Sequence, residues 1–206
     1  MSGSASQAQA ARFRGMRYLR TVLLSPCDGA QLVEFALSFP LLLVMVIGII
    51  DFGAAYNLKQ KLNNAAREGV RFAINEPCAD CSKTAPASTQ AIENTIVNYL
   101  TNANIDVCGL TGTTTPSVGP GAYASWTFTS SNCAGTSAPF TIEIDRSITF
   151  LNSASITVCA SKVLLTHPYP WTFGRIIGFL VPGATFTGPV ISTDSTMQDL
   201  PGGGAC

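Results

Sequence analysis

The chain of 206 residues has no formal net charge, and only 12% of its residues are charged. This composition argues against a nucleic-acid partner, because binding to phosphates needs Lys and Arg concentrated on one surface. The length leaves about 130 residues for one small folded domain once a leader and a membrane helix are set aside.

Residues 1–29 are predicted to form a basic leader. Four arginines lie between residues 12 and 20, and no acidic residue precedes Asp28. A secretory signal peptide is cleaved after its apolar region, whereas the candidate cleavage site here precedes one. We therefore expect a cytoplasmic leader rather than an ordinary signal peptide.

An apolar segment follows the leader. Residues 35–50 carry no charge and one clearly polar side chain, Ser38. Counted over 32–55, the segment matches the roughly 20 residues that a helix needs to cross a bilayer core. Beyond it, apolar and small residues recur at steps of three and four, as on one face of a helix. They are Leu58, Leu62, Ala65, Ala66, Gly69, Val70 and Ala73. We predict one helix over 30–74, transmembrane first and amphipathic afterwards.

Residues 75–193 are predicted to form an α+β domain with an antiparallel sheet packed on the amphipathic half of the long helix. A loop over 75–86 leads to a short helix capped by Ser88 and ending near Asn102. Residues 109–121 are rich in turn formers. Alternation of apolar and polar side chains predicts strands, most clearly over 139–145. The other predicted strands cover 123–129 and 155–166.

Two C-terminal stretches differ from the rest of the domain. Residues 168–186 are crowded with aromatic and aliphatic side chains but are too short and too interrupted to span a membrane. We expect an apolar loop that covers the core, with an exposed contact patch for a membrane or partner as the alternative. Residues 194–206 are polar and rich in glycine, which predicts a flexible tail.

The cysteine count indicates disulfides. Cys27 falls in the leader, which leaves an even set of six. These are Cys78, Cys81, Cys108, Cys133, Cys159 and Cys206. In an oxidising compartment they allow up to three disulfides, each stabilising by ~2–4 kcal/mol, in fifteen possible pairings.

Metal, redox and hydrolytic chemistry fit the sequence less well. Cys78 and Cys81 lie in a proline-flanked loop after a helix, whereas redox pairs of this spacing begin a helix after a strand. Cys108 and Cys133 lack the close spacing of a second zinc-binding pair. The single histidine, His167, has no identifiable acidic partner for a hydrolase. We expect no enzymatic activity, no cofactor and no metal.

One group of motifs is specific. Gly29 is followed by a small residue, then come the motifs Val33-Glu34-Phe35-Ala36 and Gly48-Ile49-Ile50-Asp51-Phe52-Gly53, with an early proline at Pro40 between them. The tail Ala65-Ala66-Arg67-Glu68-Gly69-Val70-Arg71-Phe72-Ala73 closes the series. Together these resemble the TadE-like family of the tight-adherence (Flp, type IVc) pilus machinery. Residues 163–170, followed by an apolar loop, resemble more loosely the strand and Tyr-Pro element found late in such proteins.

The resemblance implies a structural protein, a minor pilin or pseudopilin. A prepilin peptidase would cut between Gly29 and Ala30, and Glu34 would pair with the new amino terminus of a neighbouring subunit during assembly. The implied partners are the membrane, this peptidase, other pilin and pseudopilin subunits and the inner-membrane assembly platform. The implied location is the bacterial inner membrane, single-pass, with a cytoplasmic N-terminus and a periplasmic C-terminal domain; incorporation into a surface pilus is a further option.

Charge alone leaves the orientation undecided, because Lys and Arg lie on both sides of the span. The cysteine set and the resemblance favour the orientation given above. The alternative function is an uncleaved single-pass anchor for an envelope domain that binds a protein or ligand. Glu34 would then be a snorkelling carboxylate, and Pro40 a tolerated kink rather than a point where the helix bends or melts in a filament. A periplasmic thiol oxidoreductase using Cys78 and Cys81 is the third hypothesis.

Overall fold

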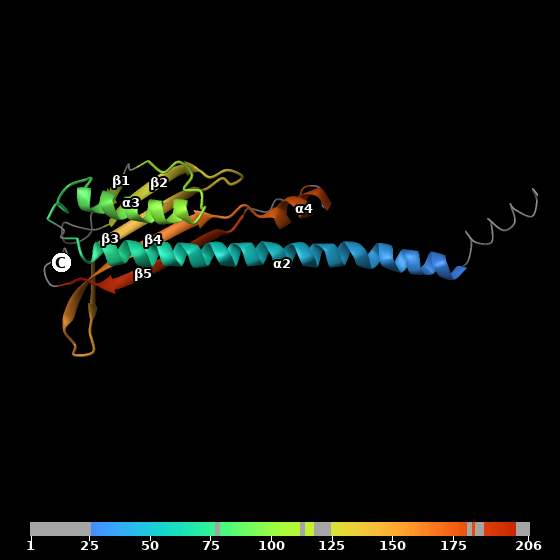
Figure 1. The fold of residues 1–206 in the computed structure, drawn as a ribbon, viewed down its shortest axis with the longest axis horizontal. Helices are drawn as coiled ribbons and strands as arrows, with labels where there is room; N and C mark the ends of the chain where they lie inside the picture. The colour runs from blue at the N-terminus through green and yellow to red at the C-terminus, as the bar shows by residue number, and fades with distance from the viewer. Residues whose placement is uncertain are drawn as a thin grey trace, which may run out of the picture. The chain divides into compact units, whose positions relative to one another are not determined.

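The computed structural model describes residues 26–76, 79–111, 114–117, 125–180, 183 and 188–200. The chain divides into two compact units, Met1–Ile49 and Ile50–Cys206, which are considered separately. The second unit combines helices with a five-stranded antiparallel sheet, so the predicted α+β class is confirmed (Figure 1). Most of the predicted basic leader lies outside the described residues.

The long helix α2 covers Pro26–Ala73 and therefore begins four residues before the predicted start at residue 30. Pro40 lies inside it, and the helix continues on both sides of this residue. Its amphipathic half buries the predicted stripe completely at Leu62, Val70 and Ala73. The charged residues of the same half, including Arg67 and Glu68, are exposed, as on a solvated helix face.

Helix α3 covers Ala87–Asn102, and Ser88 is not its N-cap, contrary to the prediction. Pro86 occupies the cap position, and Ser88 lies in the first turn. The Asp80 carboxylate replaces a local cap, accepting from the Ser88 hydroxyl at 2.6 Å and from its backbone N–H at 3.2 Å. Burial raises the pKa of Asp80, but these hydrogen bonds outweigh it and lower the pKa overall. The contact therefore stabilises α3 at neutral pH and is lost as the pH falls through that lowered pKa.

The sheet is a meander in which neighbours along the chain are neighbours in space. Its strands are β1 (Thr114–Ser117), β2 (Ser125–Asn132), β3 (Pro139–Leu151), β4 (Thr157–Pro168) and β5 (Val190–Gln198). The three predicted strands are present with shifted ends, and β3 is six residues longer than predicted.

Two strands were not predicted. β1 lies inside the turn-rich stretch 109–121, and β5 includes the first five residues of the predicted tail. The tail prediction is thus wrong for 194–198, because pairing with β4 orders a polar segment that has little alternation of its own. Residues 201–206 lie outside the described residues.

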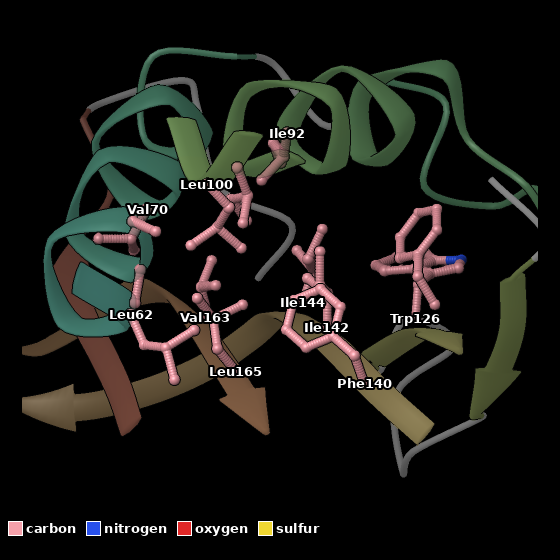
Figure 2. Packing of buried hydrophobic residues seen from close by; sticks show 14 of the residues in the cluster. Leu62, Val70, Ile92, Leu100, Trp126, Phe140, Ile142, Ile144, Val163 and Leu165 are labelled. Atoms are coloured by element: carbon pink, nitrogen blue, oxygen red, sulfur yellow. The ribbon is translucent and has the colours of Figure 1, made fainter. Parts of the chain in front are cut away.

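The core lies between this sheet and the two helices. Leu62 and Val70 of α2 and Ile92 and Leu100 of α3 face side chains of the strands (Figure 2). The facing strand residues include Phe140, Ile142, Ile144, Val163 and Leu165 (Figure 2). In β3, Phe140, Ile142 and Ile144 are all fully buried, as their alternation predicts.

A buried arginine closes the C-terminal end of α2. Arg146 of β3 donates from Nη2 to the carbonyl oxygens of Ala73, at 2.9 Å, and Glu76, at 2.6 Å. Burial lowers the pKa of Arg146, and the nearby Asp199, Asp80 and Glu76 oppose this. A cation at this position satisfies carbonyl groups that the helix end leaves without partners and complements the helix dipole.

Disulfides tie the loops of the second unit together. Cys108 is bonded to Cys133 across 25 residues, which joins the segment after α3 to the turn between β2 and β3. Closing a loop of this length stabilises by about 3 kcal/mol on the chain-entropy model. Cys81 and Cys159 are also disulfide-bonded. Cys78 and Cys206 lie outside the described residues.

Helices α2 and α3 pack closely at Gly69, which yields a test of the packing. A Cβ atom at this position would lie 2.6 Å from both Cγ1 and Cδ1 of the buried Ile96. Alanine gains about 0.5–1 kcal/mol over glycine in a helix, but overpacking a core costs about 1–3 kcal/mol. We expect Gly69→Ala to lower the free energy of unfolding by about 1–2 kcal/mol in urea titrations followed by tryptophan fluorescence.

The matched control is Gly53→Ala, at an open position of the same helix. It is expected to lose no stability. In a double-mutant cycle, Ile96→Ala should remove most of the cost of Gly69→Ala, giving a coupling of at least ~1 kcal/mol. Additive effects, or a Gly69→Ala chain as stable as the parent, would contradict the close contact.

Candidate functional site

The first part of α2 presents an apolar surface. Within the described part of the first unit, its large apolar residues are exposed, with Leu37 at 75% and Ile49 at 69%. α2 is long and apolar enough to cross a membrane, with a mean hydropathy of 2.5 in its most apolar window. A continuous exposed apolar surface of this size needs lipid or protein around it. The structure therefore supports single-pass membrane anchoring.

The predicted cleavage and assembly residues all lie on this part of α2. Gly29, Ala30 and Glu34 are exposed, and a Cβ atom at Gly29 would meet no described atom within 4 Å. Ala30 and Glu34 are four residues apart and therefore neighbours on one side of the helix. Ser38 donates its hydroxyl proton to the Glu34 carbonyl oxygen at 2.7 Å. The ion pair found among the described residues joins Lys162 to Asp194 and does not include Glu34.

A buried carboxylate lies where the apolar run ends. Asp51 is only 4% exposed, although the residues on either side of it are exposed. Its Oδ2 accepts the backbone N–H of Phe173 at 2.8 Å, and its Oδ1 accepts the hydroxyl of Tyr169 at 3.2 Å. Burial, followed by the charge of Asp51 and this hydrogen bond, raises the pKa of Tyr169. The phenol therefore remains a donor at neutral pH.

Phe173 lies in the first turn of helix α4, Thr172–Leu180. The expectation of an apolar loop is therefore wrong for this stretch: Asp51 satisfies one of the N–H groups that a helix start leaves without partners. Aromatic rings surround the junction. The Phe52 and Trp171 rings meet edge to face at 5.0 Å between centroids, and Tyr169 and Trp171 do so at 6.2 Å. Residues 181–182 and 184–186 of the predicted loop lie outside the described residues.

The part of α2 that carries Gly29, Ala30, Glu34, Asp51 and Phe52 was compared with known protein families. Residues 29–71 match the family model described as TadE-like protein. This part of the chain is TadE-like. In the same comparisons, no curated protein and no solved structure matches the chain. The resemblance predicted from the sequence is thus confirmed over residues 29–71.

The TadE-like segment contains both the exposed predicted site and the buried one. Gly29, Ala30 and Glu34 lie near its start, whereas Asp51 and Phe52 lie in its middle and contact the segment after β4. Sequence reasoning singled out the Asp-Phe motif and the Tyr-Pro element separately. It missed their contact, because nothing in the spacing of two motifs 118 residues apart indicates that they meet.

A groove of about 580 Å³ lies beside this junction in the second unit. It runs along α2 and is lined by residues of α2, of the segment after α3 and of the end of β4. They include Asn57, Lys61, Asn104, Asp106, His167 and Tyr169. Lys61 is already engaged, since its Nζ donates to the Ala103 carbonyl oxygen at 2.9 Å and so satisfies the end of α3.

Cys108, Cys133 and His167, which were considered for metal binding or catalysis, make structural contacts. The sulfur atoms of Cys108 and Cys133 lie near His167, but they are joined in a disulfide and so are not thiolate ligands. The two ring nitrogens of His167 lie 2.8 Å from the Pro168 carbonyl oxygen and 2.9 Å from that of Asp106. This buried ring therefore links the end of β4 to the segment after α3.

The Asp51 contact generates a prediction on local order. Asp51→Ala removes the carboxylate that accepts from the Phe173 N–H and from the Tyr169 hydroxyl. The Tyr169 hydroxyl keeps the Asp51 carbonyl oxygen, at 3.3 Å, whereas the Phe173 N–H loses its acceptor. We expect amide hydrogen exchange in residues 172–180 to accelerate about tenfold or more in hydrogen-exchange mass spectrometry, corresponding to ~1.4 kcal/mol or more of lost local stability.

The matched control is Tyr169→Phe, which removes one of the two hydrogen bonds and keeps the ring. It is expected to accelerate exchange in the same peptides by a smaller factor. Unchanged exchange in Asp51→Ala would show that the carboxylate does not hold the start of α4.

Proposed function

We propose that the chain is a minor pilin, or pseudopilin, of a tight-adherence type IV pilus assembly and secretion system. The observation that carries this proposal is the coincidence of two features over the same residues. The TadE-like match over residues 29–71 contains the exposed apolar residues of the first part of α2, from Leu32 to Ile50. A helix of this kind serves first as a membrane anchor and then, in a filament, as a packing surface for the helices of other subunits.

Processing is the first step of the proposed function. A prepilin peptidase would cleave the peptide bond between Gly29 and Ala30 and remove the basic leader. Both residues are exposed, and no described side chain covers them. The chain is the substrate of this reaction and not an enzyme.

Glu34 is the proposed assembly residue. A carboxylate inside an apolar helix is costly in lipid, by ~2.5–3.5 kcal/mol at the bilayer centre and less near the interface. The amino group exposed by cleavage at Ala30 lies one helical turn from Glu34, and the amino group of a neighbouring subunit offers the same charge. Pairing with it would offset the cost and would fix the register between subunits.

The proposed location is the bacterial inner membrane, with the N-terminus in the cytoplasm and the second unit in the periplasm. The oxidised cysteines support this orientation, because Cys108, Cys133, Cys81 and Cys159 all lie in the second unit. Disulfides persist in the periplasm and are rare in the cytoplasm. The proposed partners are the peptidase, other pilin and pseudopilin subunits and the inner-membrane assembly platform.

One observation favours the alternative, an uncleaved single-pass anchor for a periplasmic binding domain. α2 begins at Pro26 and continues through Gly29 and Ala30, so the proposed cleavage site lies inside a helix in the intact chain. In this alternative, the groove beside Tyr169 is a candidate place for a ligand of the domain.

Cleavage separates the two functions. When the chain is produced with its matching prepilin peptidase, we expect intact-mass and N-terminal analysis to show a mature chain that starts at Ala30. Gly29→Ala should abolish processing, because the residue before the cut would no longer be glycine. The matched control is Gly53→Ala, which makes the same change at another open glycine of α2 and should be processed normally.

A parent chain that retains its leader under these conditions would overturn the filament-subunit function and leave the uncleaved anchor. Equal processing of Gly29→Ala and the parent would show that the cut lies elsewhere.

Glu34 is tested after cleavage has been established. Glu34→Gln keeps the size of the side chain and inserts into lipid more readily, so membrane insertion and processing should persist. We expect its recovery in complexes with other pilin subunits to fall about tenfold or more, the effect of losing ~1.4 kcal/mol. Co-purification from detergent extracts measures this recovery.

The matched control for this variant is Glu68→Gln, at an exposed glutamate of the amphipathic half of α2. It should assemble like the parent chain. Normal recovery of processed Glu34→Gln would remove Glu34 from the assembly role.

A further inference from the structure

The junction around Asp51 combines features that membrane interfaces share. On α2, Ile50, Phe52 and Tyr56 are 66%, 64% and 63% exposed, so apolar and aromatic surface continues past the buried carboxylate. Trp171 packs its ring edge to face against Phe52, and Phe173 lies 6.3 Å from Trp171 between ring centroids. Aromatic residues gathered at the end of an apolar span are typical of the boundary between lipid and water.

Helix α4, which begins at this junction, also has a composition that suits the boundary between lipid and water. Its sequence, TFGRIIGFL, contains five large apolar residues, one arginine and no acidic residue. Nine residues give about 13 Å of helix, far short of the length needed to cross a bilayer. A helix that does not span a membrane can lie in its plane, with its apolar side chains at the boundary between headgroups and acyl chains.

We propose that Trp171 and α4 form an interfacial anchor, which binds the headgroup–acyl boundary of the same membrane that α2 spans. This inference rests on the membrane insertion included in the proposed function. It adds a second membrane contact, made by the folded unit itself and separate from the transmembrane segment.

Helix geometry places the junction at the required depth. Ala30 and Asp51 are 21 residues apart, which corresponds to about 32 Å along a helix. The hydrocarbon core of a bilayer is about 30 Å thick. With Ala30 at one boundary, Asp51 therefore reaches the other. Because the Asp51 carboxylate holds the Phe173 N–H at 2.8 Å, α4 begins at that same depth.

Lipid fits the junction better than a second protein chain does. Among the described residues, Asp51 is the acid at this point, and it already accepts from Tyr169 and Phe173. The sequence of α4 carries a basic residue and no acidic one, a composition that suits anionic phospholipid headgroups. The aromatic rings are continuous along the chain with the apolar surface that α2 places in the bilayer.

The two tryptophans of the chain provide the test, because they report on opposite environments. Trp126 is 2% exposed in the core of the second unit, and Trp171 lies at the junction. The full chain is reconstituted into liposomes of phosphatidylethanolamine and phosphatidylglycerol. These liposomes contain lipids spin-labelled either near the headgroup or near the end of the acyl chain. Trp126→Phe leaves Trp171 as the emitter, and Trp171→Phe leaves Trp126.

We expect headgroup-proximal labels to quench the emission of Trp171 at least twofold more than deep labels do, and both labels to leave Trp126 nearly unchanged. Trp126→Phe alters the core, so a second measurement keeps Trp126 in place. The emission of Trp171→Phe is subtracted from the emission of the parent chain, and the difference is the emission of Trp171. The two should give the same quenching ratio.

Iodide in the aqueous phase distinguishes the contrary outcomes. Trp171 quenched by iodide and not by either lipid label would place the junction in water. Trp171 protected from all quenchers would place it against protein, and either result overturns the interfacial anchor. Flotation of the same liposomes separates this proposal from the proposed membrane insertion. If the chain floats but lipid labels do not quench Trp171, only the interfacial anchor is overturned. If the chain does not float, both proposals are overturned.

Discussion

The fold of the second unit depends on how closely the amphipathic half of α2 approaches α3 and the sheet. Small residues make this approach possible, since Ala65, Ala66 and Ala73 are fully buried and Gly69 leaves room for Ile96. A larger residue at Gly69 would separate the two helices and open the core between them and β4. The same helix also contains the exposed apolar segment.

Helix ends in this protein are satisfied by side chains from outside the helix itself. Arg146 closes α2, Lys61 closes α3, Asp80 supports the start of α3, and Asp51 supports the start of α4. Each contact joins two elements and also satisfies backbone groups that a helix terminus leaves without partners. The helices of the unit therefore depend on tertiary contacts for their ends, although their apolar faces account for most of their burial.

The TadE-like segment combines an exposed apolar surface and a packing surface for the folded domain in one helix. Around Glu34 the surface is exposed and apolar, which suits lipid. From Asp51 onwards the helix contacts its own domain, and its charged residues face solvent or satisfy other helices. A substitution in this segment therefore affects either the exposed apolar surface or the fold itself, depending on which side of Asp51 it lies.

The sequence by itself determined the features that depend on local patterns. The apolar run and the repeat from Leu58 to Ala73 predicted α2, alternation predicted β3, and contiguous motifs identified the TadE-like segment. Tertiary structure alone decided the rest. β5 is ordered by pairing with β4, α4 by a carboxylate 122 residues away, and the start of α3 by Asp80 rather than by Ser88. The reason is physical: hydrophobic periodicity lies within a segment, whereas strand pairing and helix capping by distant side chains exist only once the chain has folded.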